Sequence, residues 1–322
     1  MLSRIIFAML ALLSISAHAV EYKAWTQLGA DHPVALGMQH FIDEVRTKTN
    51  GKFDGKLYTD ASLGDQNKAS ELLDKGEIGV AEFGISTLVK SLPELDVLYL
   101  PFLFRDTQHL FVVMDGDIGN GLTARLAEKN SYVIGWYDGG ARSFYTRNKP
   151  IRNLSDFKGL RLRVSNSKLY MGLVEAMDAV PVVLPFKDVP AALESGKIDG
   201  AENNLISFAT EDHYRNAHYF TFTNHVMVPE ALVVSPKLWA TLSDSEKDIF
   251  REAGQNSAVF MRQVWKKRDA EVRAQMEKNK VKFFNILDSG IYISRMRPVY
   301  KPYMDDPHKA DLIMQIMTTP SR

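Results

Sequence analysis

Several polar side chains stand at or close to the ends of predicted strands. Arg142 comes just before a strand, after a Gly-Gly-Ala run, and Arg163 lies late in the run at 160–164. Glu202 and Asn203 follow the run at 198–201. Ligands of open α/β sheets gather at the carboxyl ends of strands, and the planar, permanently charged guanidinium fits a carboxylate through two hydrogen bonds. These residues indicate a carboxylate site, although a surface ion pair is the commoner role of a single arginine.

The sequence contains none of the common catalytic motifs. It has no G-x-S-x-G elbow, no H-E-x-x-H helix and no phosphate-binding P-loop. The glycine-rich run at 116–121 (GDIGNG) differs from the dinucleotide fingerprint and indicates a turn. His213 and His218 are five residues apart, so they lie off a common helical face and do not indicate a metal pair. We therefore expect no enzyme activity, no metal and no cofactor.

Residues 1–19 are typical of a cleaved export signal. A short basic start ending at Arg4 precedes an apolar stretch at 5–15 and the small-x-small site Ala-His-Ala at 17–19. The 39 Lys and Arg residues balance the 39 Asp and Glu residues, and cleavage would remove only Arg4, leaving a net charge of about −1. That charge offers no basic excess for nucleic acid. The absence of cysteine excludes disulfides and thiolate metal sites.

Strands and helices alternate along the chain. Strands are predicted at 22–28, 52–58, 78–83 and 132–136, with helices at 33–48, 66–75 and 107–129. From residue 143 the alternation restarts, with strands at 144–146, 160–164 and 180–184 and helices at 168–178 and 189–195. Two further strands, at 219–223 and 231–234, would return the chain to the first lobe. The pattern predicts an α/β protein with two lobes and a hinge between them.

A long helix is predicted near the C-terminal end. Ser243 and Glu246 form a capping box, and the helical spacing of apolar residues then continues to about residue 279. Such a helix is about 50 Å long, which exceeds one small lobe. The alternative is two helices with a break near Gly254.

Five sequence blocks resemble those of a known family. They are residues 100–106 (LPFLFRD), 140–145 (GARSFY), 159–164 (GLRLRV), 184–189 (LPFKDV) and 198–204 (IDGAENN). In this order they resemble the DctP-type solute-binding proteins of TRAP transporters, and the similarity runs from about residue 22 to beyond residue 300. The resemblance implies a periplasmic receptor with two α/β lobes, a hinge and a long helix spanning both lobes. Its expected partners are a small carboxylate and the membrane TRAP permease subunits.

The resemblance also implies roles for individual residues. Arg163 matches the arginine that pairs with the ligand carboxylate, Arg142 matches a second arginine, and Asn203 matches the asparagine of the G-x-E-N block. We expect the first lobe to comprise residues 20–142 and about 229–265, and the second residues 143–228 and about 266–322. The cleft would lie between the lobes, and the protein is expected to be a monomer.

Residues 140–145, 200–204 and 227–230 are similar to members that bind hexuronates. A sugar acid needs polar groups for its hydroxyls and a flat apolar wall for its ring. The candidates for hydroxyl contacts are His32, Gln66, Glu82, Asn166 and Asn204, and those for the wall are Phe186 and Trp136. Pro190 stands where the family commonly has tyrosine, which could remodel the cleft. C4-dicarboxylates, aromatic or aliphatic acids and sulfonates therefore stay open as ligands.

Two other functions share these residues. A periplasmic enzyme acting on sugar acids would need a positioned acid and base, for which Glu82 and His32 are the available pair. A sensor that passes the liganded protein to a signalling receptor would use the same cleft. Only its docking partner would distinguish such a sensor from a transport receptor.

Overall fold

The computed structural model describes residues 19–321, so the predicted leader lies outside the described residues apart from Ala19. In this part of the chain nine strands form one sheet. They are β1 (Val20–Trp25), β2 (Phe53–Tyr58), β3 (Val80–Gly84), β4 (Tyr132–Thr146), β5 (Arg161–Val164), β6 (Val180–Val183), β7 (Gly200–Asn203), β8 (Tyr219–Val234) and β9 (Lys282–Asn285). Their order is β2-β1-β3-β8-β4-β7-β5-β6, with β9 paired to β8.

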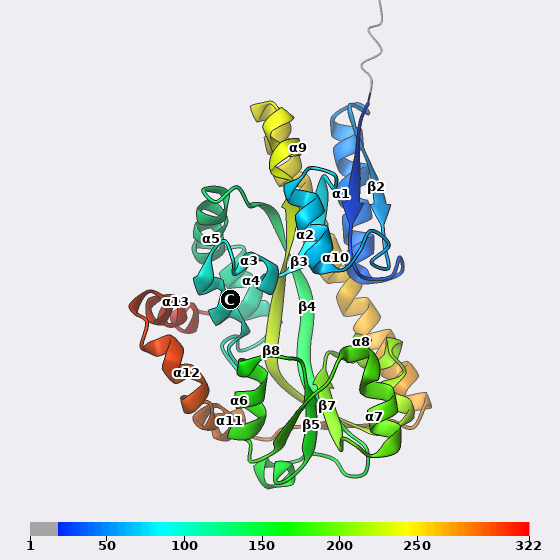
Figure 1. Cartoon of the computed structure of the whole chain (residues 1–322), viewed down its shortest axis with the longest axis vertical. Helices are drawn as coiled ribbons and strands as arrows, with labels where there is room; N and C mark the ends of the chain where they lie inside the picture. Colours follow the sequence, from blue (N-terminus) through cyan, green and yellow to red (C-terminus); the bar gives the residue numbers. More distant parts are fainter. Residues whose placement is uncertain (1–18, 322) are drawn as a thin grey trace, which may run out of the picture.

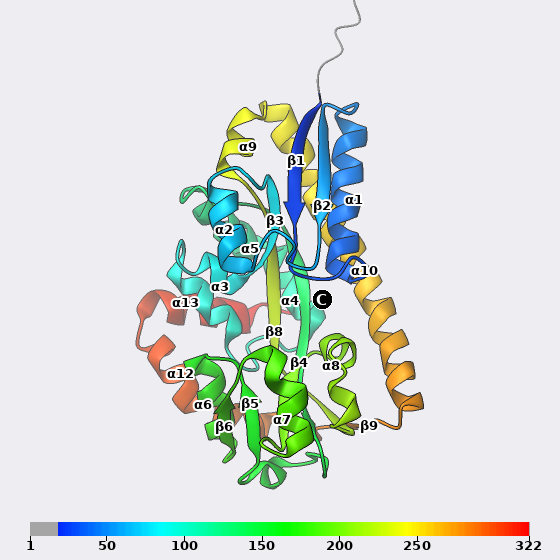
Figure 2. The same cartoon turned by 45° about the vertical axis from the view of Figure 1, so that its right-hand side comes forward.

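The strands divide the molecule into two lobes. The first lobe surrounds β1, β2 and β3, which are mutually parallel, and the second surrounds β5, β6 and β7, which are also parallel. The antiparallel strands β4 and β8 are 15 and 16 residues long and run through both lobes, as Figures 1 and 2 show. The predicted α/β fold with two lobes is confirmed, while the residue bounds of the lobes stay a prediction.

The helices cover the sheet and follow the predicted order. The α-helices are α1 (Pro33–Lys48), α2 (Gln66–Asp74), α3 (Ile85–Leu88), α4 (Thr107–Met114), α5 (Asp117–Ala127), α6 (Lys168–Ala176), α7 (Val189–Ser195), α8 (Leu205–Thr210), α9 (Pro236–Thr241), α10 (Asp244–Lys278), α11 (Ser289–Arg295), α12 (Arg297–Met304) and α13 (Pro307–Thr318). Short 3-10 turns are η1 (Pro93–Tyr99), η2 (Leu154–Phe157), η3 (Phe186–Asp188) and η4 (His213–Arg215). The single helix predicted at 107–129 is wrong, because Gly116 adopts an extended conformation and separates α4 from α5.

Helix α10 is continuous over 35 residues and runs along both lobes (Figure 2). The predicted capping box is present: Ser243 N donates to Glu246 Oε2 at 2.8 Å, and Glu246 N donates to Ser243 Oγ at 3.3 Å. The alternative of a break near Gly254 is wrong. A Cβ at that position would lie 2.4 Å from Ile134 O, so the glycine allows α10 to pack closely against β4.

Two pairs of strands predicted as separate are single long strands. The runs at 132–136 and 144–146 are both part of β4, and the runs at 219–223 and 231–234 are both part of β8. Pairing of β4 with β8 is irregular between Asp138 and Ala141 and again between Arg142 and Phe144. Bulges of this kind bend a strand without ending it. The two lobes are therefore joined by bent strands.

Gly140 occupies one of these bulges and has a φ of +79°. We expect Gly140→Ala to lower the free energy of unfolding by roughly 1–2 kcal/mol or more, because a side chain is strained in this conformation. The new Cβ would also lie 2.6 Å from Trp265 Cζ2 and 2.9 Å from Asn204 Cβ. Urea unfolding measures the change. The control is Gly121→Ala within α5, where a Cβ meets nothing within 4 Å and should stabilise the protein by about 1 kcal/mol. Equal effects of the two variants would contradict this account.

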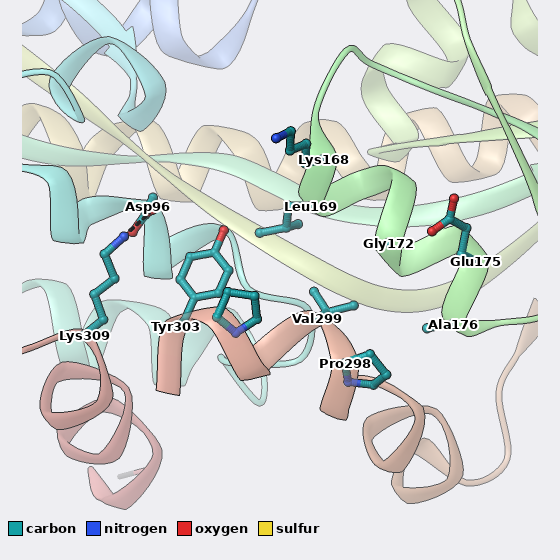
Figure 3. A pocket seen from close by; sticks show the side chains of 11 residues that line it. Asp96, Lys168, Leu169, Gly172, Glu175, Ala176, Pro298, Val299, Tyr303 and Lys309 are labelled. Atoms are coloured by element: carbon teal, nitrogen blue, oxygen red, sulfur yellow. Dashed lines mark hydrogen bonds and ion pairs between the residues drawn. The ribbon is translucent and has the colours of Figure 1, made fainter. Parts of the chain in front are cut away.

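The last helix packs against a segment from the N-terminal half of the chain. Helix α13 packs against η1, where Lys309 Nζ contacts Asp96 Oδ2 at 2.6 Å (Figure 3). Arg105 donates to Met317 O at 3.1 Å and to Thr319 O at 2.6 Å. Among the helices of residues 19–321, none has the length and apolar character needed to cross a membrane.

Two hydrophobic clusters form the core, and each draws on both lobes. One includes Trp25 and Phe83 of the first lobe together with Leu162 and Val174 of the second. The other joins α1, α10 and strands of both lobes, with Phe250 contacting the rings of Phe41 and Phe53 edge-to-face. This packing fixes the strand ends from which the polar side chains project.

Candidate functional site

A cleft of about 930 Å³ lies between the two lobes. Eight of the nine predicted ligand-binding residues line it: His32, Gln66, Arg142, Arg163, Asn166, Phe186, Asn203 and Asn204. The strand ends bring these residues together, although they are separated by up to 172 positions in the sequence. Their roles in binding a ligand stay predictions.

Arg163 projects from β5 into this cleft and is only 5% exposed. Its Nε and Nη2 donate to Leu184 O at 2.9 and 2.8 Å, and its guanidinium lies 5.6 Å from the centre of the Phe186 ring. Across residues 19–321 no carboxylate lies within ion-pair distance of Arg163. Burial lowers the pKa of this guanidinium, but an arginine in a protein keeps its charge. Three of its five N–H groups stay available for an anion.

Arg142 has a carboxylate partner within the protein. Its Nε donates to Glu202 Oε2 at 2.6 Å, and its Nη2 donates to Glu202 Oε1 at 2.9 Å and to Glu202 O at 3.1 Å. The guanidinium also lies 5.4 Å from the centre of the Tyr170 ring. These contacts hold Arg142 at the cleft wall with much of its hydrogen-bonding capacity already used.

Glu202 is fully buried between Arg142 and His225, whose Nε2 lies 3.5 Å from Glu202 Oε2. Burial alone would raise the pKa of Glu202, but the charge and hydrogen bonds of Arg142, together with the nearby His225 ring, outweigh it and lower the pKa to about 2. Glu202 is therefore ionised at neutral pH. The two cleft arginines differ in consequence: Arg142 is neutralised internally, and Arg163 is not.

The two asparagines at the end of β7 also differ in how many hydrogen bonds their side chains make within the protein. Asn203 Oδ1 accepts a hydrogen bond from Asn204 N at 2.9 Å, which directs the side-chain amide of Asn203 along the cleft wall. Asn204 Oδ1 caps α8 by accepting from Ser207 N at 2.7 Å, and its Nδ2 donates to Gly139 O at 3.1 Å. Asn204 thus shapes the cleft, and both ends of its amide are engaged.

His32 and Gln66 line the cleft from the first lobe. His32 caps α1, with its Nδ1 accepting from Val34 N at 3.3 Å, so the ring hydrogen is on Nε2. Burial lowers the pKa of His32 to about 4, and the imidazole is neutral at pH 7. Gln66 Oε1 accepts from Thr87 Oγ1 at 3.2 Å, which orients its amide. Both residues can donate hydrogen bonds to a ligand.

Asn166 and Phe186 line the cleft from the second lobe. Asn166 is exposed, and Phe186 is 37% exposed with its ring edge-to-face against His213 at 5.4 Å. Pro190 lies in the first turn of α7, where proline fits a helix, and it is not among the residues that line the cleft.

Glu82 and Trp136 do not line the cleft. Glu82 is buried on β3, where its Oε2 accepts from Thr26 Oγ1 at 2.9 Å, and it contacts the cleft residue Glu230. Trp136 is a core residue whose Nε1 donates to Thr123 Oγ1 at 3.2 Å. Glu82 and His32 consequently do not form an acid and base pair facing the cleft.

Sequence analysis missed several residues that line the cleft. They are chiefly aromatic or acidic: Tyr99, Tyr170, Trp265 and Glu230. Trp265 projects from α10 and packs edge-to-face against His32 at 5.4 Å. It occupies an ordinary position in the helical pattern, so nothing in the sequence distinguished it from a core residue. Glu230 belongs to the run at 227–230, which carried part of the family resemblance.

A second hollow of about 650 Å³ lies between α6 and α12 (Figure 3). Its walls include Leu169 and Val299, and the ion pair between Asp96 and Lys309 lies at one end. It contains neither of the arginines discussed above, so the cleft between the lobes is the better candidate for an anion. Within residues 19–321 no group of three or more His, Asp or Glu side chains could hold a metal ion.

Known proteins share this sequence and fold. The family model described as bacterial extracellular solute-binding protein, family 7, matches residues 25–306. A protein from Chromohalobacter salexigens, named solute-binding protein, is 32% identical over 310 residues, which cover 96% of this chain and 92% of that protein.

Two solved structures are similar over almost their whole length. One is a TRAP periplasmic solute-binding protein from Sulfitobacter sp. NAS-14.1 with bound β-D-galacturonate, at 32% identity and a TM-score of 0.84, covering 93% of this chain and 100% of that chain. The other is a TRAP periplasmic solute-binding protein from Roseobacter denitrificans with bound β-D-glucuronate, at 32% identity and a TM-score of 0.85, covering 94% of this chain and 100% of that chain.

Proposed function

Because the chain belongs to family 7 of the bacterial extracellular solute-binding proteins, we propose that it is a periplasmic receptor that delivers a hexuronate to a TRAP permease. The observation that carries the proposal is Arg163, a charged group in the cleft without a carboxylate partner among the described residues. A buried charge is costly unless it is paired. A ligand carboxylate supplies the missing partner and fits the free edge of the guanidinium through two hydrogen bonds.

The rest of the cleft suits a sugar acid. Its volume of about 930 Å³ lies in the usual range for small-molecule sites. Asn203, His32 and Gln66 offer hydrogen-bonding groups for hydroxyls, and the Trp265 and Phe186 rings offer apolar surface. The glucuronate and galacturonate bound to the similar structures support a hexuronate over the other carboxylates that the sequence left open.

Binding would proceed by closure of the lobes. A ligand that contacts both walls stabilises the closed arrangement through contacts that the open one lacks, which is a population shift. Closure also excludes water and strengthens the attraction between Arg163 and the carboxylate. We propose that the leader at 1–19 is removed on export and that the closed receptor docks on the permease. The cleft needs no catalytic residue for this role.

A ligand screen tests the proposal. We expect glucuronate and galacturonate to raise the melting temperature of the purified mature protein, because a ligand that binds only the folded state stabilises it. Glucose, which lacks the carboxylate, is the matched control and should have no effect. Succinate, benzoate and taurine should act more weakly than the uronates. Calorimetry then gives the affinity, and a stronger response to any of these three acids than to both uronates would overturn the hexuronate assignment.

The same samples test the enzymatic alternative. Uronate recovered by chromatography after prolonged incubation should be chemically unchanged. Conversion of the uronate to another product would contradict the role of a receptor.

A further inference from the structure

The C-terminal segment passes from one lobe to the other. After α10 the chain lies in the second lobe, where β9 pairs with residues 219–222 of β8. Helix α11 stays in this lobe: the Tyr292 ring packs edge-to-face against that of Phe157, just before β5, at 6.1 Å. Arg295 Nη2 also lies 3.3 Å from Asp178 Oδ2, just before β6. From there α12 and α13 lead along one side of the molecule toward the first lobe (Figure 1).

Residues from Tyr300 onward are held by a different part of the chain, η1 and the loop that follows it. Tyr300 Oη donates to Pro101 O at 2.9 Å. Lys309 Nζ lies 2.6 Å from Asp96 Oδ2 of η1 (Figure 3). The η1 turn in its place packs against α3, which directly follows β3. The end of the chain is therefore anchored on the first lobe by directional, polar contacts.

The contact between α12 and α6 of the second lobe is of another kind. It is apolar, and a Cβ at Gly172 of α6 would lie 3.5 Å from Val299 Cγ2 of α12. The hollow of about 650 Å³ separates other parts of the two helices (Figure 3). Within residues 19–321 no hydrogen bond or ion pair joins α6 to α12. Packed helices without such bonds can slide past one another, which is the shear type of domain movement.

A break between α11 and α12 separates the two anchored parts. Met296 ends α11 and is also the residue before α12, and Pro298 lies in the first turn of α12. Because proline has no N–H to donate, the two helices cannot continue as one regular helix across this point. The segment can therefore bend at 296–298, with α11 following the second lobe and α12 following the first.

We propose that residues 297–321 move with the first lobe, as a further connection beside β4, β8 and α10, and that α6 slides along α12 when the cleft closes. The proposal rests on the lobe closure of the proposed function, and it moves these residues out of the second lobe, to which the sequence assigned them. The hollow provides the clearance for this sliding. Asp96, Leu169 and Tyr303 line both the hollow and the cleft, so the two spaces adjoin and change together.

A disulfide between α6 and α12 tests the proposal. The chain contains no cysteine, so the double variant Gly172→Cys with Val299→Cys introduces the only pair of thiols. The 3.5 Å between a Cβ at 172 and Val299 Cγ2, whose place the Sγ of a cysteine would take, suits a disulfide. Neither residue lines the cleft. Oxidation in the absence of ligand fixes α6 on α12 in the arrangement described.

This arrangement leaves the cleft open to solvent, since Asn166 and Phe186 line it and both are exposed. We therefore expect the oxidised double variant to bind galacturonate roughly tenfold or more weakly than its reduced form, because the apparent affinity falls with the fraction of protein that can close. Calorimetry with and without dithiothreitol measures the difference, and reduction should restore the affinity.

The matched controls are the two single cysteine variants, whose affinity should not depend on dithiothreitol. Titration of free thiols checks that the disulfide has formed, and dibromobimane, which bridges neighbouring thiols, replaces it if it has not. Equal affinity of the cross-linked and the reduced protein overturns the inference.

Circular dichroism checks that the double variant folds. If it does not, the alkylation rate of Gly172→Cys alone decides: saturating galacturonate should change this rate, and an unchanged rate overturns the inference. Failure of the wild type to bind either uronate refutes the proposed function instead, and the comparison is then made with the acid found in the screen.

Discussion

Replacing Arg163 by alanine is expected to weaken ligand binding by roughly 2–5 kcal/mol, which is about 30-fold to several thousand-fold in the dissociation constant. The variant removes the one cleft cation that has no carboxylate partner among residues 19–321. It leaves the ligand carboxylate in the cleft without its main partner. Isothermal titration calorimetry with glucuronate or galacturonate measures the loss.

Two further variants separate this effect from a general change of charge. Arg161 lies on the same strand, but it is exposed and paired with Asp199 at 2.7 Å, so Arg161→Ala should bind ligand with nearly wild-type affinity. Arg163→Lys keeps the charge but loses the planar fork, and we expect most of the affinity to be lost. Wild-type affinity in Arg163→Ala, or equal losses in the alanine variants of both arginines, would disprove the assigned role.

Replacing Glu202 by glutamine is expected to lower the free energy of unfolding by roughly 3–5 kcal/mol, because it breaks an ion pair whose carboxylate is fully buried and leaves the partly buried guanidinium of Arg142 without its counter-charge. Urea unfolding at pH 7 measures the change. The control is Asp199→Asn, which breaks the more exposed pair with Arg161 and should cost no more than about 1 kcal/mol.

The effect of Glu202→Gln should depend on pH. The folded pKa of Glu202 is about 2, below its ordinary value of 4.5, so the folded state favours the ionised form. Its contribution to stability is complete above pH 4.5 and is lost as the pH falls toward 2. The difference between wild type and variant should therefore be constant from pH 5 to 7 and shrink below pH 4.5. A difference that grows on acidification would contradict this linkage.

Local sequence signals predicted the helices more accurately than the long strands. Helix α1 has the predicted bounds because Pro33 fixes its first turn and its apolar residues follow the helical period. Helix α10 begins at the predicted capping box. Strand β4 was predicted as two strands, at 132–136 and 144–146, whereas in the structure Gly139 and Gly140 lie between them within a bulge held by pairing to β8. Such pairing joins residues that are distant in sequence, and no local pattern encodes it.

The sequence predicted which residues line the cleft better than it predicted how those residues interact with one another. The arginines were placed in the cleft through the family resemblance, but the partner of Arg142 is 60 residues away, and the sequence did not reveal the pair. Glu82 was expected to contact ligand, yet every residue of β3 is buried. Alternation between faces therefore could not show whether its side chain reached the cleft or lay beneath it.

The bent strands β4 and β8 have a mechanical consequence for the proposed receptor. Because both continue through the boundary between the lobes, relative movement has to flex the ladder where its pairing is irregular, between Asp138 and Phe144. Such a connection resists large relative movements of the lobes and limits the angle through which they can close. Gly139 and Arg142 of this segment also line the cleft, so the part of the sheet that bends is also part of the surface that faces the ligand.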